Sequence, residues 1–233
     1  MSDAEAPQQR SRQLVWDLPT RLFHWALALT LVGSWVTAEA GFDYFEYHLW
    51  CGYSALTLVA FRLIWGVVGP PHARFAGFVT GPGTVWRSLQ TLVTPTPSTH
   101  AGHSPHGGWA AVLLLAVVAT QATSGLFISD DIFYAGPYNG AVSSATAGQL
   151  AQLHHLNFTL LQILVALHLT TMLWYRLRKG QNLVGAMITG RKSAAETDAI
   201  TSSRIPLAAI LLAACAGATY LLVTLAPPPI SYF

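Results

Sequence analysis

Charged residues are scarce in this sequence. Only 9% of its 233 residues are Asp, Glu, Lys or Arg, whereas 52% are hydrophobic. Soluble globular domains carry about 25% charged residues. The composition therefore indicates an integral membrane protein with the lipid bilayer as its surroundings, and it gives no indication of nucleic-acid binding.

Cysteine is also scarce, and this excludes some kinds of cofactor attachment. Cys51 and Cys215 are far apart and both lie in apolar runs. The sequence has no Cys-Xaa-Xaa-Cys-His motif for covalent haem and no cysteine pair for a metal ion. Any haem must be held by other side chains, and the nine histidines are the obvious candidates because histidine within a membrane segment usually has a function.

Long apolar stretches occur five times. A helix needs roughly 20 mainly apolar residues to cross a bilayer. The stretches that approach this length are residues 20–39, 46–69, 109–128, 150–175 and 205–226. We therefore expect an all-α integral membrane protein.

Short motifs predict where some helices begin. Pro19 opens the first, and residues 43–46 (DYFE) and 146–149 (TAGQ) resemble capping boxes before the second and fourth.

The loop over residues 70–108 is too long for a simple connection. Its residues 82–93 are amphipathic and predict a short helix lying at the membrane surface.

The positions of the cations predict the orientation. All 12 Lys and Arg residues lie near the start of the first span, at the end of the second span or in the loop after it, or between the fourth and fifth spans. The other two connections carry only acidic residues: Glu39, Asp43, Glu46, Asp130 and Asp131. Cytoplasmic loops are rich in cations. We therefore expect a multi-pass membrane protein with its N-terminus in the cytoplasm and its C-terminus on the outer side.

A signal peptide is the alternative interpretation of the first span. Arg21 precedes the apolar run, and residues 38–40 (AEA) match the small-residue pattern of a cleavage site. The run contains His24 and two tryptophans, which signal peptides rarely use. This favours a membrane helix.

Four histidines within the spans have the spacing of haem ligands. His154 and His168 are 14 residues apart, which leaves them about 40° apart on one helical face and about 21 Å apart along the axis. His155 points about 140° away from His168. His154 is therefore the better ligand.

Depth in the membrane assigns the partners of these two residues. His24 and His168 both lie about 7 to 11 Å inside the cytoplasmic surface, and His48 and His154 meet in the outer leaflet. Two axial imidazoles saturate a haem iron and suit electron transfer rather than oxygen chemistry. The predicted architecture is a four-helix haem-binding transmembrane bundle plus a fifth C-terminal transmembrane helix, with His24, His48, His154 and His168 as iron ligands of two haem b groups.

Other residues leave two interpretations open. Three glycines lie near the ligand histidines and can serve either to let a porphyrin edge approach a helix or to let two helices pack closely: Gly33, Gly52 and Gly125. The loop histidines can be solvated or interfacial residues, or they can form a metal site: His72, His100, His103 and His106. Three arginines can pair with haem propionates or extend to the membrane surface: Arg21, Arg74 and Arg176.

Several of these residues lie in motifs that resemble the bacterial diheme b-type cytochromes, a family that includes the cytochrome b subunit of nickel-iron hydrogenases. The motifs are residues 15–25 (VWDLPTRLFHW), His48 with Gly52 and Tyr53, 62–66 (RLIWG), 72–75 (HARF), 102–108 (GHSPHGG), 123–127 (TSGLF) through Gly136 and Pro137, and His154 with 166–168 (ALH). The resemblance spans about residues 14–180, and its strength is in the order of the motifs. The family often has an acidic residue where this chain has His155, which leaves His155 open as the ligand in place of His154.

The resemblance implies four core helices, haem ligation by the four histidines, and quinone exchange with a redox partner such as a hydrogenase or a c-type cytochrome. It also implies a location in the bacterial inner membrane, where the outer side that holds the C-terminus is the periplasm. We divide the chain into a disordered cytoplasmic N-terminus (1–13), a diheme domain (14–180), a cytoplasmic linker (181–204), and an additional membrane helix with an outer tail (205–233). The fifth helix lies outside the resemblance.

The function that we predict is transfer of electrons across the bilayer between a redox partner and the quinone pool, as an electron-transfer subunit of a quinone-linked oxidoreductase. The alternatives are a haem-free membrane anchor and a proton-coupled transporter, although no acidic residue lies well inside a span. Five residues near the inner haem are candidates for a cytoplasmic quinone pocket: Arg21, Trp25, His72, Arg74 and His103.

Overall fold

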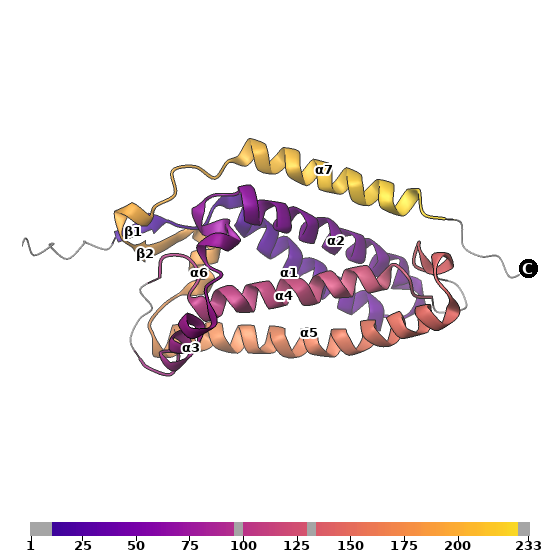
Figure 1. Cartoon of the computed structure of the whole chain (residues 1–233), viewed down its shortest axis with the longest axis horizontal. Coiled ribbons are helices and arrows are strands. Elements are labelled where there is room, and N and C mark those ends of the chain that lie inside the picture. Colours follow the sequence, from indigo (N-terminus) through magenta and orange to yellow (C-terminus); the bar gives the residue numbers. More distant parts are fainter. Residues whose placement is uncertain (1–10, 96–99, 130–133, 228–233) are drawn as a thin grey trace, which may run out of the picture. The chain divides into compact units, whose positions relative to one another are not determined.

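The computed structural model describes residues 11–95, 100–129 and 134–227 (Figure 1). Five long helices account for most of it: α1 (Leu18–Glu39), α2 (Phe45–Val68), α4 (Pro105–Gly125), α5 (Ser144–Arg178) and α7 (Ile205–Thr224). The shorter elements are α3 (Pro82–Gln90), α6 (Leu183–Thr189), β1 (Ser11–Leu14) and β2 (Arg191–Ala194). Predictions for residues 1–10, Asp130, Asp131 and the end of the outer tail fall outside the described residues.

Four of the long helices are long and apolar enough to cross a membrane: α2, α4, α5 and α7. The chain is therefore a mostly helical, multi-pass membrane protein. Although α1 has 22 residues, it is not among the four. Arg21, His24 and Glu39 reduce its hydropathy, so its crossing of the membrane stays a prediction.

The chain forms two compact units. The first contains the described residues up to Leu22, Trp65–Ala111 and Leu167–Ile205, and the second contains Phe23–Ile64, Val112–Ala166 and the described residues from Pro206. The long helices therefore contribute segments to one or both units.

The two strands lie in the first unit. β1 and β2 pair antiparallel, with Ser11 opposite Ala194 and Leu14 opposite Arg191. Gly190, in the left-handed conformation at φ 79°, ends α6, and its carbonyl accepts hydrogen bonds from the backbone amides that follow β1. Thus residues 11–13, predicted to be disordered, belong to a strand, and the predicted linker over 181–204 contains a helix and the partner strand.

A buried aspartate marks the start of α1. Asp17 is fully buried and its carboxylate accepts hydrogen bonds from the Thr20 backbone amide at 2.9 Å, the Thr20 hydroxyl at 2.8 Å and the Trp65 indole at 3.1 Å. Asp17 is therefore the N-cap of α1, and its carboxylate also satisfies polar groups that are buried beside it. The helix begins one residue before Pro19, close to the predicted start.

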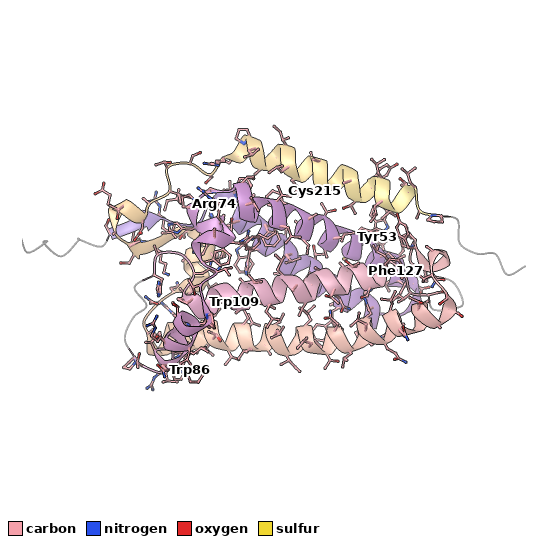
Figure 2. The ribbon with its side chains drawn as sticks, viewed as in Figure 1. Tyr53, Arg74, Trp86, Trp109, Phe127 and Cys215 are labelled. Atoms are coloured by element: carbon pink, nitrogen blue, oxygen red, sulfur yellow. The ribbon has the colours of Figure 1, made fainter. Side chains whose placement is uncertain are left out.

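Helix α3 confirms a short helix within residues 82–93, although it ends at Gln90, and its position at the membrane surface stays a prediction. Its Trp86 side chain is 65% exposed (Figure 2). It is held to the rest of the first unit by a hydrogen bond between the Ser88 hydroxyl and the His106 ring.

In the second unit, polar contacts connect the helix segments. Asn157 of α5 is buried and its amide nitrogen donates to the Val117 carbonyl of α4 at 2.9 Å and to the Gln121 side-chain oxygen at 2.7 Å. The Thr57 hydroxyl of α2 donates to the Tyr53 carbonyl, so its oxygen accepts the hydrogen bond that it shares with the Thr219 hydroxyl of α7 at 3.0 Å. Such bonds help to hold helices together in lipid, where the hydrophobic effect does not drive their association.

The start of α5 differs from the predicted capping box. The helix begins at Ser144, and the Ser143 hydroxyl accepts from the Thr146 backbone amide at 3.2 Å. Ser143 is therefore the N-cap, and Thr146 lies inside the first turn. Both residues are good caps by type, and the sequence alone does not distinguish between them.

Candidate functional site

Two of the predicted ligand histidines meet in the second unit. His48 lies in the first turn of α2 and His154 lies on α5. Their ring centroids are 6.4 Å apart and their planes are inclined at 73°. Both side chains are half-buried.

Each of these two rings has its Nδ1 atom occupied. His48 Nδ1 donates to the Ser34 carbonyl of α1 at 2.8 Å. Ser124 of α4 donates its hydroxyl to the Thr120 carbonyl at 2.7 Å, and its oxygen therefore accepts from His154 Nδ1 at 3.1 Å. Within the described residues neither Nε2 atom has a hydrogen bond. Bonds of this kind fix the tautomer that offers Nε2 to a metal.

The distance between the rings fits a shared metal ion. Imidazole nitrogens bind metals at about 2.0 to 2.1 Å, and a ring centroid lies about 1.1 Å beyond its nitrogen. Two imidazoles on opposite sides of one ion therefore place their centroids about 6 Å apart, close to the observed 6.4 Å. The described residues contain no group of three or more His, Cys, Asp or Glu side chains that could hold a metal. A pair of imidazoles suits an ion whose other ligands come from a porphyrin.

Glycines shape the surroundings of the pair in different ways. A Cβ on Gly125 would lie 3.2 Å from His154 Cε1, so the glycine makes room for the ligand ring itself. A Cβ on Gly33 would lie 3.2 Å from the Cys51 sulfur, so this glycine serves helix packing. A Cβ on Gly52 would have no neighbour within 4 Å. Contact of a porphyrin edge with Gly52 stays a prediction.

Comparison with known proteins identifies the family. The family model of prokaryotic cytochrome b561 matches residues 15–190, well over half of the chain. This chain belongs to the prokaryotic cytochrome b561 family. No curated protein and no solved structure matches the chain significantly.

Membership of the cytochrome b561 family confirms the resemblance found in the sequence. The chain is a membrane b-type cytochrome that binds haem b and takes part in transmembrane electron transfer. The two strands lie immediately outside the matched region, with β1 before its first residue and β2 after its last. Helix α7 lies beyond it.

His155 is exposed, in contrast to His154. The two rings are inclined at 89° with centroids 6.2 Å apart, and His154 is the one that approaches His48. This arrangement agrees with the rotation of about 100° per residue along a helix. It supports His154 rather than His155 as the proposed ligand.

The other two predicted ligands belong to different units. His24 lies on α1 in the second unit, with its ring centroid 5.1 Å from that of Trp25. His168 lies on α5 in the first unit. Both are half-buried. Their pairing stays a prediction from helical depth.

Two arginines of the first unit have donors available for an anion. The Nε atoms of Arg21 and Arg74 are buried and donate to no acceptor in the described part of the chain. A buried donor without an acceptor is costly. This fits the predicted pairing of these guanidinium groups with haem propionates.

Three of the four loop histidines are half-buried. His72 bonds through Nε2 to the Asp198 carbonyl at 2.8 Å. The His103 ring centroid lies 4.7 Å from that of Trp16 and 4.5 Å from that of Phe78. Only His100 is exposed. With no metal-binding group among the described residues, the metal-site interpretation is wrong for the part of the loop that the structure describes.

Sequence reasoning missed a buried network around His106. Its Nδ1 bonds to the Ser88 hydroxyl at 2.7 Å, and its Nε2 lies 3.1 Å from the Tyr175 hydroxyl. Lys179 is also buried; its ammonium group donates to the Thr91 carbonyl at 2.9 Å and lies 5.3 Å from the Tyr175 ring centroid. Burial lowers the pKa of Lys179. The network connects α3 to α4 and α5.

The predicted cytoplasmic quinone pocket is divided between the units. Trp25 belongs to the second unit. The other four candidates belong to the first: Arg21, His72, Arg74 and His103. This pocket therefore stays a prediction.

Proposed function

We propose that this member of the cytochrome b561 family holds two haem b groups and transfers electrons across the bilayer between a redox protein and the quinone pool. His48 and His154 would hold the outer haem, and His24 and His168 the inner one. The redox partner would be a hydrogenase, a c-type cytochrome or another electron carrier, which would make the chain an electron-transfer subunit of a quinone-linked oxidoreductase.

The observation that carries the proposal is the geometry of His48 and His154. Their centroid separation of 6.4 Å suits opposite ligands of one iron. Ser34 and Ser124 hold the two Nδ1 atoms, so both rings are oriented before a ligand is bound. A haem with two imidazole ligands supplies one-electron redox chemistry and has no open position for O₂.

The membrane orientation is part of the proposal. The cation distribution supports a cytoplasmic N-terminus and a periplasmic C-terminus in the inner membrane. The inner pair would then lie near the cytoplasm. The buried Nε atoms of Arg21 and Arg74 support an anionic group, such as a propionate, on that side.

Two other functions are less well supported. A proton-coupled transporter usually needs acidic side chains inside the membrane, but Glu46, the second residue of α2, is the only acidic residue in the four candidate membrane helices. A haem-free anchor would have no need for two histidines whose ring centroids lie 6.4 Å apart and whose Nε2 atoms make no hydrogen bond within the described residues.

The experiment that tests the proposal is a haem count on the purified full-length protein. A dithionite-reduced minus oxidised spectrum, with haem assayed per chain, should give two low-spin b haems. His168→Ala should retain only the outer haem, and His48→Ala only the inner one. His100→Ala is the matched control, because His100 is exposed in the loop and should have no effect.

Each alternative has its own outcome in this assay. A purified protein without any haem signal would refute the electron-transfer function and favour the anchor or the transporter. Equal loss of both haems in every variant would refute the assignment of pairs. Two haems in His168→Ala would show that His168 is not a ligand.

A further inference from the structure

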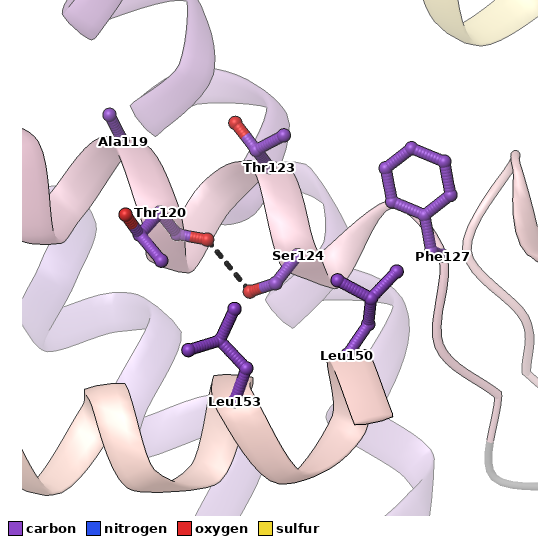
Figure 3. A pocket seen from close by; sticks show the side chains of 7 residues that line it. All are labelled: Ala119, Thr120, Thr123, Ser124, Phe127, Leu150 and Leu153. Atoms are coloured by element: carbon purple, nitrogen blue, oxygen red, sulfur yellow. Dashed lines mark hydrogen bonds between the residues drawn. The ribbon is translucent and has the colours of Figure 1, made fainter. Parts of the chain in front are cut away.

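An open, groove-like cavity of about 330 Å³ lies between α4 and α5 in the second unit (Figure 3). Figure 3 shows Leu150 and Leu153 extending from α5 towards Ser124 of α4. The volume of the cavity is at the lower end of the range for small-molecule sites. Since both helices are candidate membrane spans, a ligand would enter from the lipid phase.

The lining combines an apolar surface with hydroxyl groups. Phe127, Leu150 and Leu153 supply the apolar part. Thr120, Thr123 and Ser124 supply three hydroxyls on one side of the cavity. A few polar groups in a mainly apolar site are typical of sites that orient a small amphipathic molecule.

Two of these hydroxyls are available to a ligand. Elsewhere in the long helices, threonine hydroxyls donate to the carbonyl four residues earlier: Thr37 at 2.7 Å, Thr57 at 3.0 Å and Thr171 at 2.8 Å. The hydroxyls of Thr120 and Thr123 make no hydrogen bond within the described residues. A hydroxyl that lies in hydrocarbon without a partner is unfavourable, so an acceptor on a bound molecule would stabilise both.

The third hydroxyl connects the cavity to the histidine pair. Ser124 is only 3% exposed, and its oxygen accepts from His154 Nδ1. Thus a residue of the cavity wall also orients a proposed haem ligand. Hydrogen bonds to a ligand imidazole tune the properties of a haem iron. Occupancy of the cavity should therefore be detectable at the outer haem.

We propose that this cavity binds the head group of a lipid-soluble quinone or quinol. A quinone has a flat apolar ring that matches Phe127 and the leucines, and its carbonyl oxygens can accept from the threonine hydroxyls. A lipid acyl chain would leave those hydroxyls without partners. The inference rests on the proposed function and locates quinone exchange beside the outer histidine pair.

The test measures binding of the fluorescent quinol analogue 2-heptyl-4-hydroxyquinoline N-oxide to the purified haem-loaded protein by fluorescence titration. The double variant Thr120→Val, Thr123→Val keeps the shape of the cavity and should weaken binding about tenfold, as expected for two lost hydrogen bonds. Leu153→Trp fills the cavity and should abolish binding. Thr171→Val, whose hydroxyl bonds its own helix, is the control and should bind like wild type.

Haem content and spectra of the same samples separate this inference from the proposed function. If the double variant and Leu153→Trp keep normal haem content and bind the analogue as tightly as wild type, the quinone site in the cavity is refuted and the proposed function is not. A wild-type protein that binds no analogue, or whose bound analogue is displaced by phospholipid and not by decylubiquinone, would also overturn it. Equal weakening in Thr171→Val would overturn it because the effect would not be specific to the cavity. A protein without haem would instead refute the proposed function.

Discussion

Removing the hydroxyl of Ser124 should loosen the outer haem. Ser124→Ala deletes the oxygen that accepts from His154 Nδ1 at 3.1 Å. The Gln121 backbone carbonyl, which lies 3.1 Å from the Ser124 hydroxyl oxygen, stays in place in the variant and offers the ring one possible acceptor. Loss of such an orienting bond typically costs 10- to 100-fold in metal affinity. We expect the lower value, about tenfold, which corresponds to about 1.4 kcal/mol.

Ser34→Ala is the matched control on the other ligand. His48 Nδ1 donates to the Ser34 backbone carbonyl at 2.8 Å, and the substitution leaves that carbonyl in place. The Ser34 hydroxyl, at 3.1 Å from the same nitrogen, is the only contact removed. The variant should therefore hold its haem nearly as well as wild type.

The assay is the rate of haem transfer from each detergent-purified variant to excess apomyoglobin, followed by absorbance. Ser124→Ala should release one haem about tenfold faster than wild type, and the other at the wild-type rate. Thermal unfolding of the same samples shows whether the fold is retained. Equal release from Ser34→Ala and Ser124→Ala, or no change in either, would refute the view that the Nδ1 contacts orient the ligands.

The remaining predictions concern α5. His154→Ala should lose one haem per chain whereas His155→Ala should keep both, by haem assay; the reverse result would mean that α5 is rotated relative to the structure. Asn157→Leu removes two hydrogen bonds to α4, one of them to Gln121, each worth about 0.6 kcal/mol in a membrane. It should lower the free energy of unfolding by about 1 to 2 kcal/mol, measured by denaturation in detergent. Gln152→Leu, at an exposed position of the same helix, is its control, and equal stability of the two variants would contradict the role of Asn157.

The parts of the fold that depend on local pattern could be predicted from the sequence. Runs of about 20 apolar residues locate the long helices to within a few residues, because a helix in lipid satisfies its own backbone. The rotation argument also distinguishes His154 from His155, since it needs only the period of one helix. The meeting of His48 and His154 follows from depth counting along two helices.

The sheet could not be predicted in this way. Strand β1 has only four residues, too few for a pattern, and the whole matched region separates it from its partner along the chain. The His106 network was missed for a similar reason. Its contacts to Ser88 and Tyr175 come from separate helices, and a sequence shows His106 only as a polar residue in a loop.

The pairing of β1 with β2 has a consequence for biosynthesis. Ser11 is made early, but its partner Ala194 emerges only after α5 and α6 have been translated. Until then the backbone amides of Val15 and Trp16 lack the Gly190 carbonyl that accepts from them in the folded protein. In chains synthesised in N- to C-terminal order, α1, α2, α4 and α5 are therefore all translated before this end of the first unit can close. The strand pair forms only in chains whose translation has passed the whole family region.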